Sequence, residues 1–160
     1  MLRTYRARRE SHRLGFTLLE LTVVTMIIGT LATLVAPSVQ GVRVRAQNAA
    51  ATTDIRVIEA EIAVYIFENR EPPVSLAAIG RAGIIDPWGL PYVYNPLDGE
   101  KKGPEGNARK DKFLVPLNSD YDLYSMGADG ESKVPLSPTV SHDDILRALD
   151  GAFVGLASDF

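Results

Sequence analysis

A long stretch without charge near the amino terminus restricts this chain more than any other feature of its sequence. No side chain from Leu21 to Val42 is charged, and most are Leu, Val, Ile, Ala, Thr or Met. As a helix, the 22 residues from Phe16 to Pro37 would extend ~33 Å, which matches the ~30 Å hydrocarbon core of a bilayer. We therefore predict a transmembrane helix over residues 16–37.

Charge is distributed unevenly on the two sides of this stretch. Residues 1–15 hold five arginines and one glutamate, a net charge of +4, whereas the other 145 residues hold 12 basic and 19 acidic side chains, a net −7. Because arginines beside a membrane segment stay cytoplasmic, we expect the carboxyl-terminal body on the periplasmic side of a bacterial inner membrane. This arrangement indicates an oriented membrane protein and argues against a nucleic-acid-binding protein.

A cleaved secretory signal explains the apolar stretch less well. Such signals have an apolar region of about 7–15 residues followed by a small-x-small cleavage site. Here the apolar region is longer, and Leu34 and Pro37 make a poor site around Ala36. An uncleaved signal anchor of a periplasmic protein fits the apolar length equally well.

Glu20 distinguishes these alternatives, because it lies inside the apolar stretch. A charged side chain within the bilayer is costly and usually marks function, although a glutamate near the headgroups can also be solvated there or protonated. A functional carboxylate needs a cationic partner. A cut after Gly15 would supply one, since the new α-amino group of Phe16 would lie one helical turn from Glu20.

The segment Gly15-Phe16-Thr17-Leu18-Leu19-Glu20 resembles the type IV prepilin signature, and Pro37 falls where these proteins commonly carry a helix-kinking proline. The resemblance implies that a membrane aspartyl peptidase cuts after Gly15 and methylates the new amino terminus of Phe16. It also implies that Glu20 of one subunit neutralises the Phe16 amine of a neighbour and sets the axial register of a filament.

Beyond Pro37 the sequence predicts that the helix continues and ends at Pro72-Pro73. Apolar residues recur at three- and four-residue spacing along its second half, which predicts packing on a globular body. Further elements are expected as follows: a short helix over 75–80 capped by Ser75, a rigid turn over 86–91 with Trp88 as its core anchor, strands over 92–94 and 121–125, a solvated mobile loop over 95–112 that includes Arg109, and a helix from the Ser141–Asp144 cap through Leu149.

Two segments, 86–94 (DPWGLPYVY) and 121–130 (YDLYSMGADG), resemble the major pseudopilin of type II secretion systems. The resemblance implies an α+β, pilin-like fold in which a long, half-transmembrane helix packs on a small antiparallel sheet with a loop-rich carboxyl-terminal region. Its expected parts are a leader (1–15), a membrane half of the helix (16–37) and a periplasmic domain (38–160). The loop before Tyr121 and the tail 148–160 are longer than is usual in that family.

The function implied is that of a structural subunit of a periplasmic pseudopilus that drives protein export. The expected partners are copies of the chain itself, minor pseudopilins, the prepilin peptidase, and an inner-membrane assembly platform with its ATPase. A type IV pilin of a surface fibre is the nearest alternative, and the absence of cysteine disfavours it because pilins often close a carboxyl-terminal disulfide.

Metal binding and catalysis complete the sequence-based expectations. The resemblance implies a structural Ca²⁺ with Asp129 and Asp144 as side-chain ligands and Ser125 nearby, oxygen donors of the kind that calcium prefers. An Asp-Gly turn followed by a helix cap explains the same residues without metal, and the stretch 133–138 differs from the family's usual glycine-rich loop. We expect no enzyme, because after cleavage His142 is the only histidine and no catalytic set surrounds it.

Overall fold

The computed structural model describes residues 15–97 and 108–160, except for the side chains of residues 34–38. The chain divides into two compact units, Met1–Gly41 and Val42–Phe160, and each is described by itself. Residues 1–14 of the predicted leader lie outside the described residues.

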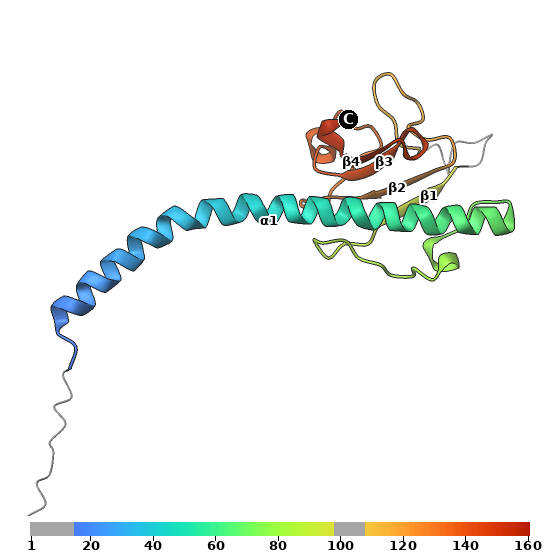
Figure 1. The fold of residues 1–160 in the computed structure, drawn as a ribbon. Coiled ribbons are helices and arrows are strands. Elements are labelled where there is room, and N and C mark those ends of the chain that lie inside the picture. The colour runs from blue at the N-terminus through green and yellow to red at the C-terminus, as the bar shows by residue number, and fades with distance from the viewer. Residues whose placement is uncertain (1–14, 98–107) are drawn as a thin grey trace, which may run out of the picture. The chain divides into compact units, whose positions relative to one another are not determined.

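Helix α1 (Leu18–Asn69) contains 52 residues and is the longest element (Figure 1). Its helical assignment continues through Pro37, which confirms that this proline does not end the helix; the kink predicted there stays a prediction. The helix ends just before Pro72-Pro73, as expected, because a proline disfavours helical geometry in the residue before it. Arg70 leaves the helix in a left-handed conformation with φ 64°.

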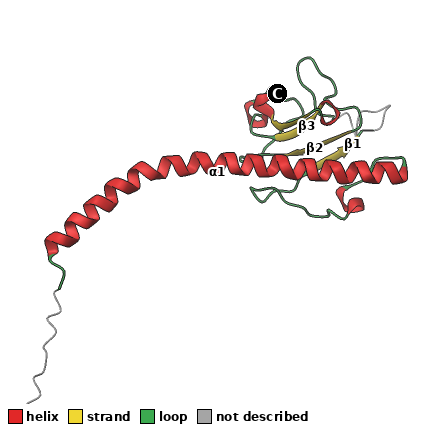
Figure 2. Cartoon of the chain, in the orientation of Figure 1, coloured by secondary structure: helices red, strands yellow, loops and turns green. Residues whose placement is uncertain are grey.

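The second unit contains a four-stranded antiparallel sheet with the order β1-β2-β3-β4 (Figure 2). Tyr94 pairs with Leu123, Tyr124 with Leu146, and Leu146 with Gly155. The predicted α+β class, a long helix packed on a small antiparallel sheet, is thereby confirmed. The strands are β1 (Val93–Pro96), β2 (Tyr121–Ser125), β3 (Ile145–Ala148) and β4 (Phe153–Leu156).

The helix predicted from Ser141 through Leu149 is wrong, because Ile145–Ala148 form the inner strand β3. Ile145 packs in the cluster that includes α1, whereas the next residue, Leu146, packs in a second cluster. A strand buried on both faces shows no alternation of polar and apolar residues. Its sequence therefore resembled a short helix behind an acidic cap.

The tail after Ala148 completes the sheet with a strand that was not predicted. Leu149, Asp150 and Gly151 all have positive φ angles, of 52°, 53° and 91°. This tight turn returns the chain antiparallel to β3 as β4, so that Arg147 pairs with Val154.

The core has two parts. On α1, Ala51, Ile55, Ile58 and Ile62 are completely buried and pack with residues of the sheet, including Leu123 and Ile145. Their three- and four-residue spacing confirms the predicted apolar face. The second cluster consists of Leu117, Leu136, Leu146, Ala148 and Ala157.

Two predicted details of the connecting segment have different outcomes. The short helix is present as a 3₁₀ helix, η1 (Leu76–Ile79), but the Ser75 side chain makes no capping hydrogen bond. Trp88 packs against the core from its turn, as predicted. That turn is held by Asp86, whose Oδ1 accepts the N–H groups of Trp88 at 3.0 Å and Leu90 at 2.9 Å.

Candidate functional site

The start of α1 holds Glu20 through a reciprocal set of hydrogen bonds with Thr17. The Thr17 N–H and hydroxyl donate to Glu20 Oε2 at 2.9 and 2.8 Å, and the Glu20 N–H donates to Thr17 Oγ1 at 3.2 Å. This is a capping box, in which a threonine at the cap and a glutamate three residues later satisfy unpaired N–H groups of the first turn. The carboxylate is thereby fixed at the positive end of the helix.

The predicted cleavage site directly precedes this capping box. Gly15, Phe16 and Thr17 have no regular secondary structure and are exposed, and the Phe16 side chain is 88% exposed. The Gly15–Phe16 bond thus lies in a non-helical segment, and cleavage there stays a prediction. Helix α1 begins at Leu18, so the placement of the Phe16 amine one helical turn from Glu20 stays a prediction.

Large apolar side chains are exposed along the first part of α1. Its threonines donate their hydroxyl hydrogens to backbone carbonyls of the same helix: Thr22 to Leu19 at 2.9 Å and Thr30 to Ile27 at 2.8 Å. Such internal bonds satisfy hydroxyl groups without water. Within the described residues, no helix meets the joint requirement of length and apolar character for crossing a membrane. The exposed apolar residues are Phe16, Leu18, Leu19, Leu21, Val23, Val24, Met26, Ile27, Ile28 and Leu31.

The three predicted calcium ligands each have a different partner. Ser125 Oγ donates to Asp86 Oδ2 at 2.5 Å. Asp129 is exposed, and its Oδ1 accepts the N–H of Glu131 at 2.8 Å. Asp144 is completely buried and forms an ion pair with Arg109, whose Nη2 lies 2.5 Å from Asp144 Oδ2.

This arrangement does not fit the calcium site that the resemblance implied. Calcium needs six to eight converging oxygens, whereas among the described residues no group of three or more His, Cys, Asp or Glu side chains could hold a metal ion. In addition, Oδ2 of Asp144 is already paired with the guanidinium group of Arg109. Burial raises the pKa of Asp144 above its ordinary value, although the hydrogen bond from Ser132 and the charge of Arg109 oppose this shift.

Asp143 holds the Gly127–Gly130 turn instead of capping a helix. Its Oδ2 accepts the N–H groups of Ala128 at 2.8 Å and Asp129 at 3.1 Å. Gly127 has φ 68°, and a Cβ atom built on it would lie 2.3 Å from the backbone oxygen of Asp143. The close approach of these two backbone segments therefore requires glycine at position 127.

We expect Gly127→Ala to lower the free energy of unfolding by about 3 kcal/mol, because a strained positive φ and a backbone clash act together. Gly80→Ala is the matched control, since Gly80 has φ 76° but nothing within 4 Å of its Cβ position. Gly80→Ala should lower the free energy of unfolding by only about 1 kcal/mol. Thermal unfolding followed by the fluorescence of Trp88, the single tryptophan, measures both, and equal losses would contradict the proposed clash.

Two buried arginines were missed by sequence reasoning. Arg109 was assigned to a solvated loop, which is wrong, because its side chain is only 3% exposed; the rest of that loop, residues 98–107, lies outside the described residues. Arg147 of β3 is also buried, and it pairs with Glu59 of α1 at 2.8 Å and with Asp120 at 2.7 Å. No local pattern indicates either residue, because their partners are far away in the sequence.

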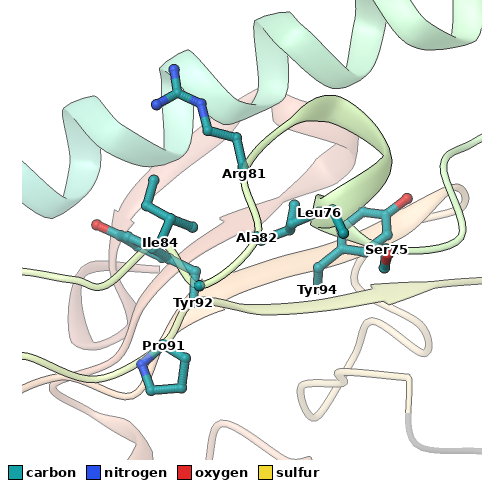
Figure 3. A pocket seen from close by; sticks show the side chains of 10 residues that line it. Ser75, Leu76, Arg81, Ala82, Ile84, Pro91, Tyr92 and Tyr94 are labelled. Carbon is teal, nitrogen blue, oxygen red and sulfur yellow. The ribbon is translucent and has the colours of Figure 1, made fainter.

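A shallow cavity of about 370 Å³ lies beside η1 (Figure 3). Arg81 is the one charged residue among those that line it, and its guanidinium pairs with Glu61 of α1. Burial raises the pKa of the lining Tyr92, and its hydroxyl donates to Asp54 at 2.9 Å. Both groups make contacts that hold the fold together, and His142 is exposed.

Several proteins that are named type II secretion system core protein G are similar to this chain. The protein from Escherichia coli (strain K12) is 36% identical over 122 residues, which cover 73% of this chain and 83% of the relative. The protein from Pseudomonas aeruginosa is 32% identical over 138 residues, covering 73% and 84%, and that from Klebsiella pneumoniae is 31% identical over 135 residues, covering 82% and 91%. No protein-family profile and no solved structure matches the chain.

These relatives extend over most of the chain, and the fold carries the long helix and small antiparallel sheet that the resemblance implied. The chain therefore belongs to the family of type II secretion system core protein G, the major pseudopilin, and is a structural subunit of the secretion pseudopilus rather than an enzyme.

Proposed function

We propose that this pseudopilin enters its filament through the first turn of α1. A prepilin peptidase cuts after Gly15 and methylates Phe16, and Glu20 of one subunit then neutralises the Phe16 amine of a neighbouring subunit. The observation that carries the proposal is the capping box, which fixes the Glu20 carboxylate at the exposed apolar start of the helix.

Electrostatics favours the pairing of the Phe16 amine with a Glu20 carboxylate when subunits come together. A positive amine at the amino-terminal end of a helix faces the positive end of the helix dipole, and a nearby carboxylate compensates it. Both groups are costly when buried alone among apolar side chains and much less so when paired. Thr17 uses only Oε2 of Glu20, so a further cation would approach Oε1.

We further propose that residues 16–37 span the bacterial inner membrane, with the amino terminus in the cytoplasm and the second unit in the periplasm. The absence of charge from Leu21 to Val42, the exposed apolar side chains and the internally bonded threonines support membrane insertion. The five arginines before Gly15 support the orientation. Assembly then requires an inner-membrane platform with its ATPase, and minor pseudopilins to begin the filament.

The intact mass of the chain, extracted from the membrane fraction of its native host, tests this processing. We expect loss of residues 1–15 and the addition of one methyl group. Gly15→Leu is the control, because a large side chain at the cleavage site should leave the chain uncut and unmethylated. An uncut wild-type chain would overturn the proposal and make α1 an ordinary anchor.

A further inference from the structure

Arg109 forms an ion pair with Asp144, one of the two side chains that the family resemblance implied as calcium ligands. Its side chain is 3% exposed, and its Nη2 lies 2.5 Å from Oδ2 of the completely buried Asp144. Its Nη1 donates to Ser132, and its guanidinium lies 4.2 Å from the ring centre of Tyr124. A planar guanidinium can make several hydrogen bonds and also stack on an aromatic ring, which suits it to such an interior position.

The same residue joins three segments that are distant in the sequence. Arg109 precedes β2, Ser132 lies in the connection between β2 and β3, and Asp144 directly precedes β3. The backbone N–H of Arg109 also donates to Oδ2 of the buried Asp122 on β2, at 2.7 Å. A bound metal ion stabilises a loop-rich region in the same way, by drawing ligands from several segments together.

The negative charge of Asp144 is already neutralised. Its Oδ2 accepts from Ser132 Oγ at 2.6 Å as well as from Arg109. Within the described residues, the buried side-chain atoms without a hydrogen-bond partner are Arg109 Nε and Asp144 Oδ1. One is a donor and the other an acceptor of the same ion pair.

The other expected ligands are also engaged. Ser125 Oγ donates to Asp86 and accepts the N–H of Gly127 at 3.1 Å, and Asp129 closes its own turn. A divalent ion beside Asp144 would meet the like charge of the buried guanidinium, and this repulsion is strong in a poorly solvated interior.

We propose that Arg109 is a built-in cation that takes the place of a structural metal, so that the second unit of this pseudopilin folds independently of calcium. The proposal concerns the fold of that unit, and its test is separate from the processing of Gly15.

The calcium response of the wild-type chain is the first test. Thermal unfolding of the full chain in detergent, followed by Trp88 fluorescence, is compared in EDTA and in millimolar calcium chloride. We expect unfolding midpoints that agree within about 1 °C, because a ligand that does not bind the native state does not stabilise it. A midpoint several degrees higher in calcium, or stoichiometric calcium binding in a calorimetric titration, would overturn the proposal.

Substitution of the arginine is the second test. Arg109→Met removes the charge and should lower the midpoint in EDTA by at least about 5 °C, since it leaves a buried carboxylate unpaired. Arg109→Lys keeps the positive charge but loses the several N–H donors of the planar guanidinium group. Its unfolding midpoint should therefore lie between those of the wild type and Arg109→Met. Arg45→Met, at an exposed position of α1, is the matched control and should leave the midpoint unchanged. An Arg109→Met chain as stable as the wild type would contradict the proposal, and the calcium test decides even if this variant does not fold.

Discussion

Replacing Glu20 with leucine is expected to reduce the yield of sedimentable filaments by at least about tenfold, while the chain still inserts into the membrane. The substitution leaves the amine of Phe16 without its carboxylate in an apolar subunit contact. An uncompensated buried charge costs about 3–5 kcal/mol, which corresponds to a factor of about 10² to nearly 10⁴ in the equilibrium for adding each subunit.

Thr22→Leu is the matched control for this experiment. It also places a leucine in the exposed apolar part of α1, but it removes only a hydroxyl that donates within the helix to Leu19. It should therefore form filaments at close to the wild-type level. Wild-type filament yield from Glu20→Leu would refute the proposed pairing, and a failure of that variant to reach the membrane fraction would assign Glu20 to insertion instead of assembly.

Replacing Arg147 with methionine is expected to cause a large loss of stability in the second unit. The guanidinium donates to Glu59 Oε1 at 2.8 Å and to both carboxylate oxygens of Asp120, at 2.7 and 2.9 Å. It also stacks 4.1 Å from the ring centre of Tyr121. This one side chain therefore connects helix α1, strand β3 and the start of strand β2.

The network holds Arg147 in its charged form. Burial lowers the pKa of the guanidinium, but its hydrogen bonds to Asp120 and Glu59 outweigh burial and raise it. Removing the cation leaves two carboxylates behind that are 35% and 19% exposed, so water compensates them in part. We expect a loss of about 3 kcal/mol, and a fall of roughly 10 °C in the unfolding midpoint of a unit of this size.

Arg56→Met is the matched control, because Arg56 shares the same carboxylate group, with its Nη1 3.1 Å from Glu59 Oε2. Its side chain is 47% exposed, and an exposed ion pair contributes less than about 1 kcal/mol. Trp88 fluorescence in thermal unfolding compares the two variants. Equal unfolding midpoints for the two variants would show that burial does not determine how much Arg147 contributes to stability.

The sequence predicted those features that depend on neighbouring residues. The buried face of α1 repeats every three or four residues. The capping box at Thr17 and Glu20 also closes within three residues, but it was not predicted. The end of α1 follows from Pro72-Pro73. Each of these signals is local, so it survives in the sequence without knowledge of the fold.

Features that depend on distant partners could not be predicted. Arg147 and Glu59 are 88 residues apart, and Arg109 and Asp144 are 35 residues apart. The residues next to an arginine in a polar loop do not indicate whether its side chain is solvated or is buried in an ion pair with a distant carboxylate. The strand β3 was missed for a related reason, since burial of both its faces is a property of the assembled sheet and not of residues 145–148.

A reconstruction of the filament at side-chain resolution would show the proposed pairing itself, through the distance between the Phe16 nitrogen and the nearest Glu20 carboxylate of another subunit. The proposed pairing predicts a separation of about 3 Å, that of a charge-assisted hydrogen bond, at every subunit contact. A separation beyond about 8 Å, where exposed charges are largely screened, or a Glu20 side chain directed away from the amine, would contradict it.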